Sequence, residues 1–120
     1  MDERFLRNEM LWGKDGQARL TAAHVIVFGL GGVGSYVTEC LARAGVGELT
    51  LVDSDTVALS NLNRQLLSEV SLLGVGKAQT AAERVRRVNP NVAVHAVGEF
   101  LTEENAAALL TDCDAVMDGL

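Results

Sequence analysis

Four glycines within six residues directly follow an apolar run, an arrangement that suits the binding of a nucleotide phosphate. They are Gly29, Gly31, Gly32 and Gly34, and the run is His24–Phe28. Their G-x-G-x-x-G spacing permits a tight turn after a strand, close approach of backbone to phosphate, and close packing of the next helix. Backbone N–H groups and the helix dipole attract an anion at such a point. The sequence therefore predicts a phosphate site made of backbone.

Asp53 is the second candidate, because it ends another apolar run nineteen residues after Gly34. A carboxylate at the end of the second strand can accept hydrogen bonds from both hydroxyls of a ribose. The glycines and Asp53 taken alone suit NAD as well as ATP, so they predict a nucleotide without choosing between the two.

Two cations beyond Asp53 bear on that choice. Residues 60–65 include Asn61 and Arg64, and Lys77 begins the next predicted helix, where its charge opposes the helix dipole unless an anion is shared. A guanidinium and an ammonium on one phosphate chain would stabilise the charge that develops when a nucleophile attacks the α-phosphate and pyrophosphate leaves. A dehydrogenase needs no such pair. Taken by themselves, however, Arg64 and Lys77 are more simply explained as solvated surface residues.

Alternating strands and helices must position these side chains. Strands are predicted at 24–28, 48–52, 92–97 and 114–117. Helices are predicted at 2–12 and 17–20, after the glycines as far as Gly45, from Lys77 to Asn89, and from Thr102 onward. Right-handed crossovers make this a Rossmann-like, doubly wound α/β fold with a mostly parallel sheet of strand order 3-2-1-4. Ligands then bind at the carboxyl ends of the strands.

For two segments the sequence allows more specific predictions. The polar stretch 54–76 is too long for an ordinary connection and is rich in groups that could meet a ligand. In the helix after the glycines, the residues Val37, Cys40, Leu41 and Ala44 form one apolar stripe, which predicts that Cys40 is a small core residue.

Composition narrows the function classes. The 120 residues suffice for one core and are 48% apolar, so we expect a single domain, 1–120. No further residues follow the last apolar run to cover the strand that it predicts, which suggests truncation at the C-terminal end. A net charge of −6 argues against a nucleic-acid surface in this segment. Two distant cysteines predict neither a disulfide framework nor a zinc site. No apolar run is long enough to span a membrane and no secretion signal is evident, so a cytoplasmic location is expected.

Six motifs in order resemble those of the ThiF-type, ubiquitin-activating-enzyme-like adenylyltransferases. They are Arg4-Phe5-Leu6-Arg7, the glycine loop 29–34, Ala44-Gly45-Val46-Gly47 with the strand after it, residues 60–65, Gly76-Lys77, and Val88-Asn89-Pro90. The resemblance implies the N-terminal half of a ThiF-type domain that binds ATP and Mg²⁺ and adenylates a carboxylate. It implies Gly32 and its neighbours at the phosphates, Asp53 on the ribose, and Asn61, Arg64 and Lys77 around the triphosphate. It also implies a homodimer in which Arg7 reaches into the partner's site.

Within that family the N-terminal motif, Gly-Gly-Val-Gly-Ser and 60–65 are most similar to the tRNA threonylcarbamoyladenosine dehydratase branch. That branch activates the threonylcarbamoyl carboxylate on a tRNA adenosine, which then cyclises with loss of water. The family's magnesium-binding aspartate directly follows the fourth strand, about where Leu120 ends the sequence, so no metal ligand is assigned here and these residues alone are not expected to catalyse. The tRNA surface is expected elsewhere. Alternatives are activation of a ubiquitin-like sulfur carrier, an NAD-binding oxidoreductase domain, and a non-catalytic nucleotide-binding dimerisation module.

Overall fold

Residues 2–120, which this computed structural model describes, fold around a sheet of four parallel strands. The strands are β1 (His24–Phe28), β2 (Glu48–Val52), β3 (Ala93–Val97) and β4 (Ala115–Asp118), in the spatial order β3-β2-β1-β4. Every neighbouring pair is parallel, and His24 lies opposite Glu48 in the central pair. The predicted α/β fold and the strand order 3-2-1-4 are confirmed. The third and fourth strands begin one residue later than predicted.

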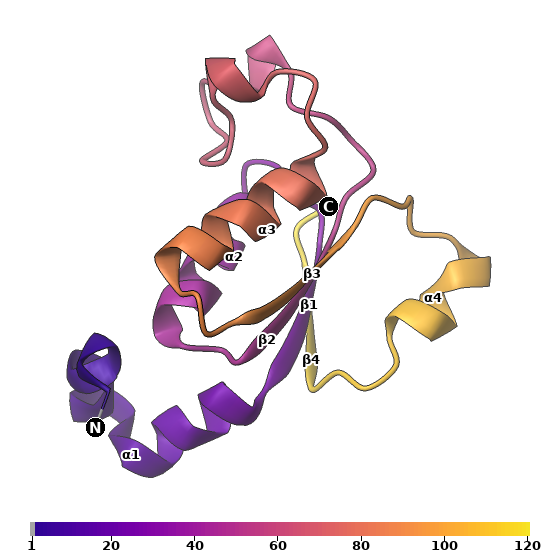
Figure 1. Ribbon diagram of the computed structural model, residues 1–120. Coiled ribbons are helices and arrows are strands. Elements are labelled where there is room, and N and C mark those ends of the chain that lie inside the picture. The colour runs from indigo at the N-terminus through magenta and orange to yellow at the C-terminus, as the bar shows by residue number, and fades with distance from the viewer. Residues whose placement is uncertain (1) are drawn as a thin grey trace.

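Helices cover both faces of the sheet. Helices α2 (Gly34–Ala44) and α3 (Lys77–Val88) lie on one face, and α4 (Glu103–Leu109) lies on the other (Figure 1). The chain enters through a short 3₁₀ turn, η1 (Glu3–Phe5), and helix α1 (Leu6–Ala22), which lie near the amino ends of the strands. The carboxyl ends of the strands therefore remain open for a site.

The main core lies between the sheet and the pair α2 and α3. Strands β1 and β2 are buried along almost their whole length because both faces are covered, which explains their continuous apolar sequences. Ile26, Leu49 and Leu51 are fully buried, and burial of each such side chain contributes about 1.5–3 kcal/mol. The core fixes the strand ends at which the glycines and Asp53 stand.

The buried face of α2 differs from the predicted stripe. Cys40 is exposed, and the buried positions are Gly34, Ser35, Thr38 and Ala42. The prediction of Cys40 as a core residue is wrong because it lies off this buried face, although Val37 and Leu41 of the predicted stripe are partly buried against the core. The hydroxyl of Thr38 donates to the carbonyl oxygen of Gly34 (2.9 Å), so it is buried without an unpaired polar group. This small face lets the helix approach the sheet closely.

Helix ends follow the predicted signals. Gly45, in the left-handed region with φ 91°, ends α2, and Thr102 caps α4 by accepting a hydrogen bond from the backbone N–H of Asn105 (3.3 Å). Gly13, with φ 75°, breaks the helical geometry of α1, which agrees with the predicted end of the first helix near that residue. No helix among residues 2–120 is both long enough and apolar enough to cross a membrane.

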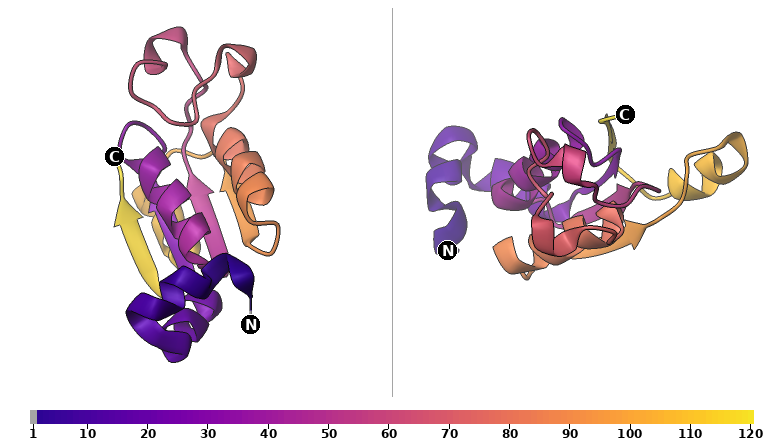
Figure 2. Two further views of the ribbon diagram at one scale, coloured as in Figure 1. Left: turned by 90° about the vertical axis from the view of Figure 1, so that its left-hand side faces the viewer. Right: turned by 90° about the horizontal axis from the view of Figure 1, so that it is seen from above.

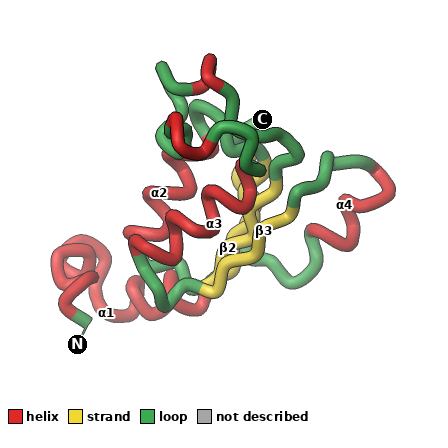
Figure 3. Tube along the Cα trace, turned by 45° about the horizontal axis from the view of Figure 1, so that its top comes forward, coloured by secondary structure: helices red, strands yellow, loops and turns green. Residues whose placement is uncertain are grey.

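The polar segment 54–76 forms a separate excursion above the carboxyl ends of the strands (Figure 2). Only two short 3₁₀ turns, η2 (Leu59–Asn61) and η3 (Val70–Leu72), interrupt its loops (Figure 3). Its base is closed by hydrogen bonds between its two arms, from Val57 N to Val75 O and from Lys77 N to Asp55 O, both 2.9 Å long. Buried Val57 and Leu67 anchor it to the body of the domain.

Candidate functional site

A cleft of about 390 Å³ opens at the carboxyl edge of the sheet. Of the residues predicted to bind a ligand, it is lined by Gly29, Gly31, Asp53 and Lys77. These come from the ends of β1 and β2 and from the start of α3, so the crossovers bring together residues that are up to 48 positions apart in the sequence. The predicted location of the site at the carboxyl ends of the strands matches this cleft.

Two of the four glycines are required by the fold itself. Gly29 has φ 86°, and a Cβ there would lie 2.8 Å from the backbone of Gly119. A Cβ at Gly34 would overlap the carbonyl oxygen of Gly29, because the first turn of α2 passes directly over the end of β1. These two glycines allow the tight turn and the close helix packing that the sequence predicts.

The other two glycines are not explained by packing inside the chain. The nearest atom to a Cβ at Gly31 would be Nε2 of Gln65, at 3.5 Å, and a Cβ at Gly32 would lie 3.8 Å from Cγ of Arg64. Within residues 2–120, the backbone N–H groups of Gly31, Gly32 and Val33 donate no hydrogen bond. A bare loop with free donors at a helix start is suited to an anion.

Asp53 holds this loop in place. Its Oδ2 accepts a hydrogen bond from the backbone N–H of Leu30 (2.8 Å), and its Oδ1 accepts one from that of Asp55 (2.8 Å). Sequence reasoning assigned Asp53 to a ribose and missed this contact with the loop. Because each carboxylate oxygen has a second lone pair, the side chain can still accept hydrogen bonds from a ligand.

Lys77 is the most unusual residue of the cleft. Its side chain is only 8% exposed, although lysine is rarely buried without a partner. Its Nζ lies 4.0 Å from Oδ2 of Asp55, whose side chain is 74% exposed, so the contact is long and largely solvated. The hydrogen bond from Lys77 N to Asp55 O fixes the start of α3 beside the cleft. A weakly compensated ammonium beside free backbone donors favours binding of an anion.

Arg64 and Asn61 do not line the cleft. The guanidinium of Arg64 is exposed and donates to the carbonyl oxygen of Ser60 (3.0 Å) and to Oδ1 of Asn63 (2.9 Å), although its stem passes over Gly32. Asn61 is buried and accepts a hydrogen bond from the backbone N–H of Ala58 (2.8 Å), which closes η2. Their predicted contacts with a triphosphate remain predictions.

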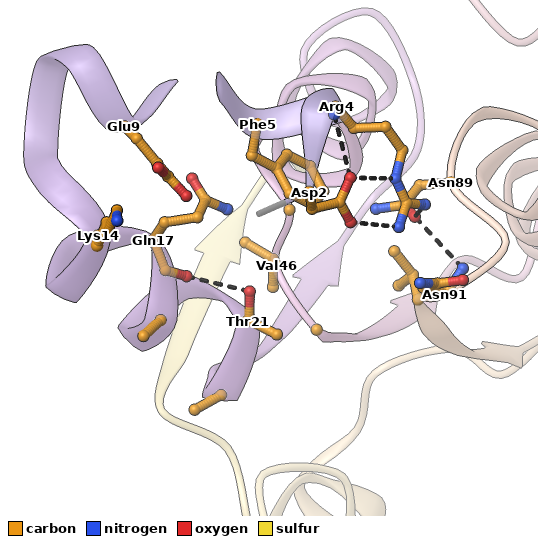
Figure 4. Close-up of a pocket in the computed structure, with 15 residues that line it drawn as sticks. Asp2, Arg4, Phe5, Glu9, Lys14, Gln17, Thr21, Val46, Asn89 and Asn91 are labelled. Carbon is orange, nitrogen blue, oxygen red and sulfur yellow. Dashed lines mark hydrogen bonds and ion pairs between the residues drawn. The ribbon is translucent and has the colours of Figure 1, made fainter. Parts of the chain in front are cut away.

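Arg7 is exposed on α1, the helix that lies near the amino ends of the strands (Figure 1). The larger hollow of the molecule, about 490 Å³, lies at that same end (Figure 4). There, the Arg4 guanidinium donates to both carboxylate oxygens of Asp2 and to Oδ1 of Asn89. Its hydrogen bonds lower the pKa of the Asp2 carboxyl. This hollow contains none of the predicted site residues.

An ion pair ties together the two helices that form one side of the site. Arg84 of α3 donates to both carboxylate oxygens of Glu39 of α2, at 2.8 and 2.9 Å. The hydrogen bond from Arg84 is the largest cause of the lowered pKa of the Glu39 carboxyl. Residues 2–120 contain no group of three or more His, Cys, Asp and Glu side chains placed to hold a metal ion.

Comparison with known proteins identifies the family of this chain. The model of the ThiF family matches residues 5–120. The chain belongs to the ThiF family. A tRNA threonylcarbamoyladenosine dehydratase of Haemophilus influenzae is 41% identical over 99% of this chain, and a molybdopterin-synthase adenylyltransferase of Escherichia coli is 43% identical over 87% of it. Identity alone therefore does not separate these two relatives of this ThiF-family chain.

Solved structures agree with this membership. The crystal structure of E. coli tRNA N6-threonylcarbamoyladenosine dehydratase, TcdA, in complex with ATP matches 98% of this chain with a TM-score of 0.94 and 38% identity. The match covers 49% of that protein, and the sequence match covers 46% of the H. influenzae enzyme. The ThiF-family chain described here spans about half the length of the relatives it matches.

Proposed function

We propose that the protein binds ATP in the carboxyl-edge cleft and uses it to adenylate a carboxylate. The observation that carries this proposal is the nearly buried Lys77 side chain, whose ammonium has only a 4.0 Å contact to an exposed carboxylate and which lines the same cleft as the bare loop. An NAD site would not need this cation. The ATP complex of TcdA, a relative similar over almost the whole chain, supports the choice of nucleotide.

Each part of the cleft then has a role in the reaction. The free N–H groups of Gly31, Gly32 and Val33 bind phosphate oxygens, and Asp53 accepts hydrogen bonds from the ribose. A carboxylate oxygen of the substrate attacks the α-phosphorus, the bond from that phosphorus to the bridging oxygen breaks, and pyrophosphate leaves with the electron pair. Lys77 stabilises the charge that accumulates on the departing phosphates, joined by Arg64 once its guanidinium turns from Ser60 toward Gly32.

The described residues do not form a metal site of their own. A Mg²⁺ ion is normally held by one or two carboxylates together with substrate phosphates, and of the exposed carboxylates at the cleft, Asp55 and Glu99, Asp55 lies beside Lys77 and could contribute. When bound, the ion would supply neutralisation of phosphate charge.

The proposed substrate is the threonylcarbamoyl group on a tRNA adenosine, whose activated carboxylate cyclises with net loss of water. Similarity over 99% of this chain to the H. influenzae dehydratase supports it. With a net charge of −6, these residues would leave most of the contact with tRNA to other parts of the protein. The alternative substrate is the C-terminal glycine of a ubiquitin-like sulfur carrier, supported by the similarity to the molybdopterin-synthase adenylyltransferase. A tRNA substrate would also fit a cytoplasmic location.

Exchange of labelled pyrophosphate into ATP tests the proposal and separates the substrates. Exchange that depends on threonylcarbamoyl-tRNA supports the first substrate, and exchange that depends on a sulfur carrier supports the second. Arg64→Ala should lower the exchange rate far more than it lowers ATP affinity; equal losses would mean that its role is binding alone. ATP binding without exchange would indicate a non-catalytic module, and a calorimetric preference for NAD would contradict the proposal.

Arg7 supports a homodimer as the working form. It belongs to the helix near the amino ends of the strands, whereas the cleft is at their carboxyl ends, so the proposed contact of Arg7 with a nucleotide requires a second copy. Mixing and reassembling equal amounts of inactive Arg7→Ala and Lys77→Met proteins should restore activity to about a quarter of the wild-type level, because about half of the dimers are mixed and each of these has one intact site of two. No recovery on verified subunit exchange would contradict a contribution from the partner subunit.

A further inference from the structure

We infer that Gln65 is a further phosphate-binding residue of the cleft: its side-chain Nε2 donates a hydrogen bond to a non-bridging oxygen of the phosphate chain beside Gly31. This inference rests on the proposed binding of ATP. It adds a neutral donor beside the backbone N–H group of Gly31.

The first observation is a donor without an acceptor in the protein, carried by a largely buried side chain. Gln65 is 7% exposed and lines the cleft, and its Nε2 donates no hydrogen bond within residues 2–120. A carboxamide nitrogen carries two N–H donors, and Nε2 stays accessible from the cleft that this residue lines. Such a donor at the wall of a cleft indicates that the acceptor comes from a ligand or solvent.

The second observation is the direction in which this donor lies. Nε2 would be the nearest atom to a Cβ at Gly31, at 3.5 Å, so the donor faces one of the two loop glycines that packing within the chain does not require. A side chain at Gly31 would intrude between the loop and the amide. The free N–H of Gly31 and the carboxamide of Gln65 therefore border the same space.

The amide is also preorganised. The backbone N–H of Gln65 donates to the carbonyl oxygen of Asn61 (2.9 Å), and its carbonyl oxygen accepts from the N–H of Ser68 (3.0 Å). The hydroxyl of Ser68 donates a weaker bond to Oε1 (3.5 Å), which leaves the nitrogen end for the cleft. Buried Leu67 anchors the same turn. Little conformational freedom is lost when such a side chain binds.

Gln65 complements the charged residues. Lys77 supplies charge, which attracts any anion, whereas a carboxamide supplies a directed donor that favours one orientation of the phosphate chain. Gln65→Met keeps length and apolar stem and removes both donors. The matched control is Gln17→Met at the other end of the sheet, because Gln17 is equally buried, at 5% exposure, but its amide is paired within the chain.

The experiment combines calorimetry with ¹⁵N-edited NMR of the protein titrated with ATP. Gln65→Met should raise the dissociation constant for ATP about tenfold or more, since hydrogen bonds to charged groups are among the stronger ones. Gln17→Met should change it less than twofold. In the wild type, the side-chain NH₂ signals of Gln65, identified as the pair missing from Gln65→Met, should shift together with the backbone signals of Gly31 and Gly32.

Each other outcome overturns the inference in a distinct way. If Gly31 and Gly32 shift while the Gln65 pair does not, ATP binds but Gln65 does not contact it. If the pair shifts but Gln65→Met binds ATP as tightly as the wild type, the amide lies near the phosphates without donating to them. If no signal shifts and calorimetry detects no binding, the proposed ATP site is wrong as well. Equal loss of affinity in Gln65→Met and Gln17→Met would indicate a purely structural role.

Discussion

The two hollows at opposite ends of the sheet differ in how their polar groups are satisfied. The amino-edge hollow is the larger, about 490 Å³ against about 390 Å³ for the carboxyl-edge cleft. In the larger hollow, Arg4 is bonded to Asp2 and Asn89, and the hydroxyl of Thr21 is bonded to the carbonyl oxygen of Gln17 (Figure 4). These polar groups bind partners within the chain, which is what a structural contact between α1 and the body of the domain requires.

Two buried glutamines make the same contrast. Gln17 accepts a hydrogen bond from Nε1 of Trp12 (3.0 Å) and donates to the carbonyl oxygen of Ala44 (2.9 Å), so both ends of its amide are used. Gln65 in the cleft uses only its oxygen, weakly. Lys77, likewise, has only a distant partner. Unused donors, rather than volume, distinguish the candidate site from the larger hollow.

The largest expected effect comes from replacing a lysine in each hollow by methionine, one at a time. Lys77→Met should lower the rate of ATP–pyrophosphate exchange roughly 10²- to 10³-fold, the usual cost of removing one group that stabilises developing charge. Lys14→Met, in the amino-edge hollow, should leave the rate unchanged. Similar losses in both variants would break the distinction between the two regions.

The next effect separates the two kinds of glycine within the cleft. Gly34→Ala should destabilise the fold by about 3 kcal/mol, because the new methyl group overlaps the carbonyl oxygen of Gly29. Gly31→Ala should change stability by less than about 0.5 kcal/mol but weaken ATP binding roughly tenfold, since it obstructs the approach of phosphate to backbone. Urea unfolding and calorimetry measure the two quantities. A Gly31→Ala protein that binds ATP normally would place the phosphates elsewhere.

The smallest effect concerns the Glu39–Arg84 pair, which lies outside both hollows. Glu39→Gln should lower the free energy of unfolding at pH 7 by about 1 kcal/mol, because the pair is partly solvated. The pKa of Glu39 is lower in the folded protein than in the unfolded chain, so its stabilisation is complete above the unfolded pKa and is lost as pH falls through the folded pKa. Urea unfolding between pH 7 and pH 3 should show the two proteins converging on acidification. A constant difference would mean that ionisation of Glu39 is not its source.

The sequence predicts the fold well because the signals are local and repeated. Apolar runs separated by caps and glycines define the strands and helices, and right-handed crossovers in a Rossmann-like sheet give the order 3-2-1-4. The prediction is wrong for Cys40, because the apolar periodicity of α2 does not mark its buried face at that position. A close helix–sheet contact selects small residues, including Ser35 and Thr38, which a hydrophobicity pattern does not count as core.

The candidate site was predictable only in part. The spacing of the glycines after the first strand identified them as candidates, and the strand order places Gly29 and Gly31 in the cleft. The excursion 54–76 has no periodicity, so nothing local in its sequence indicates that Gln65 is buried or that the Arg64 guanidinium turns back to Ser60. The arms of this segment are held together by hydrogen bonds between residues distant in the sequence, such as that from Val57 N to Val75 O. Nor does the sequence indicate that Asp53 is bonded to Leu30.

That bond between Asp53 and Leu30 links the two halves of any nucleotide bound here. The same carboxylate is placed to meet the sugar and restrains the strand-to-helix turn that would meet the phosphates. Recognition at one end of the ligand is thus mechanically coupled to the shape of the receptor at the other. Replacing Asp53 would loosen the turn as well as remove an acceptor, so an affinity lost in such a variant could not be attributed to sugar recognition alone.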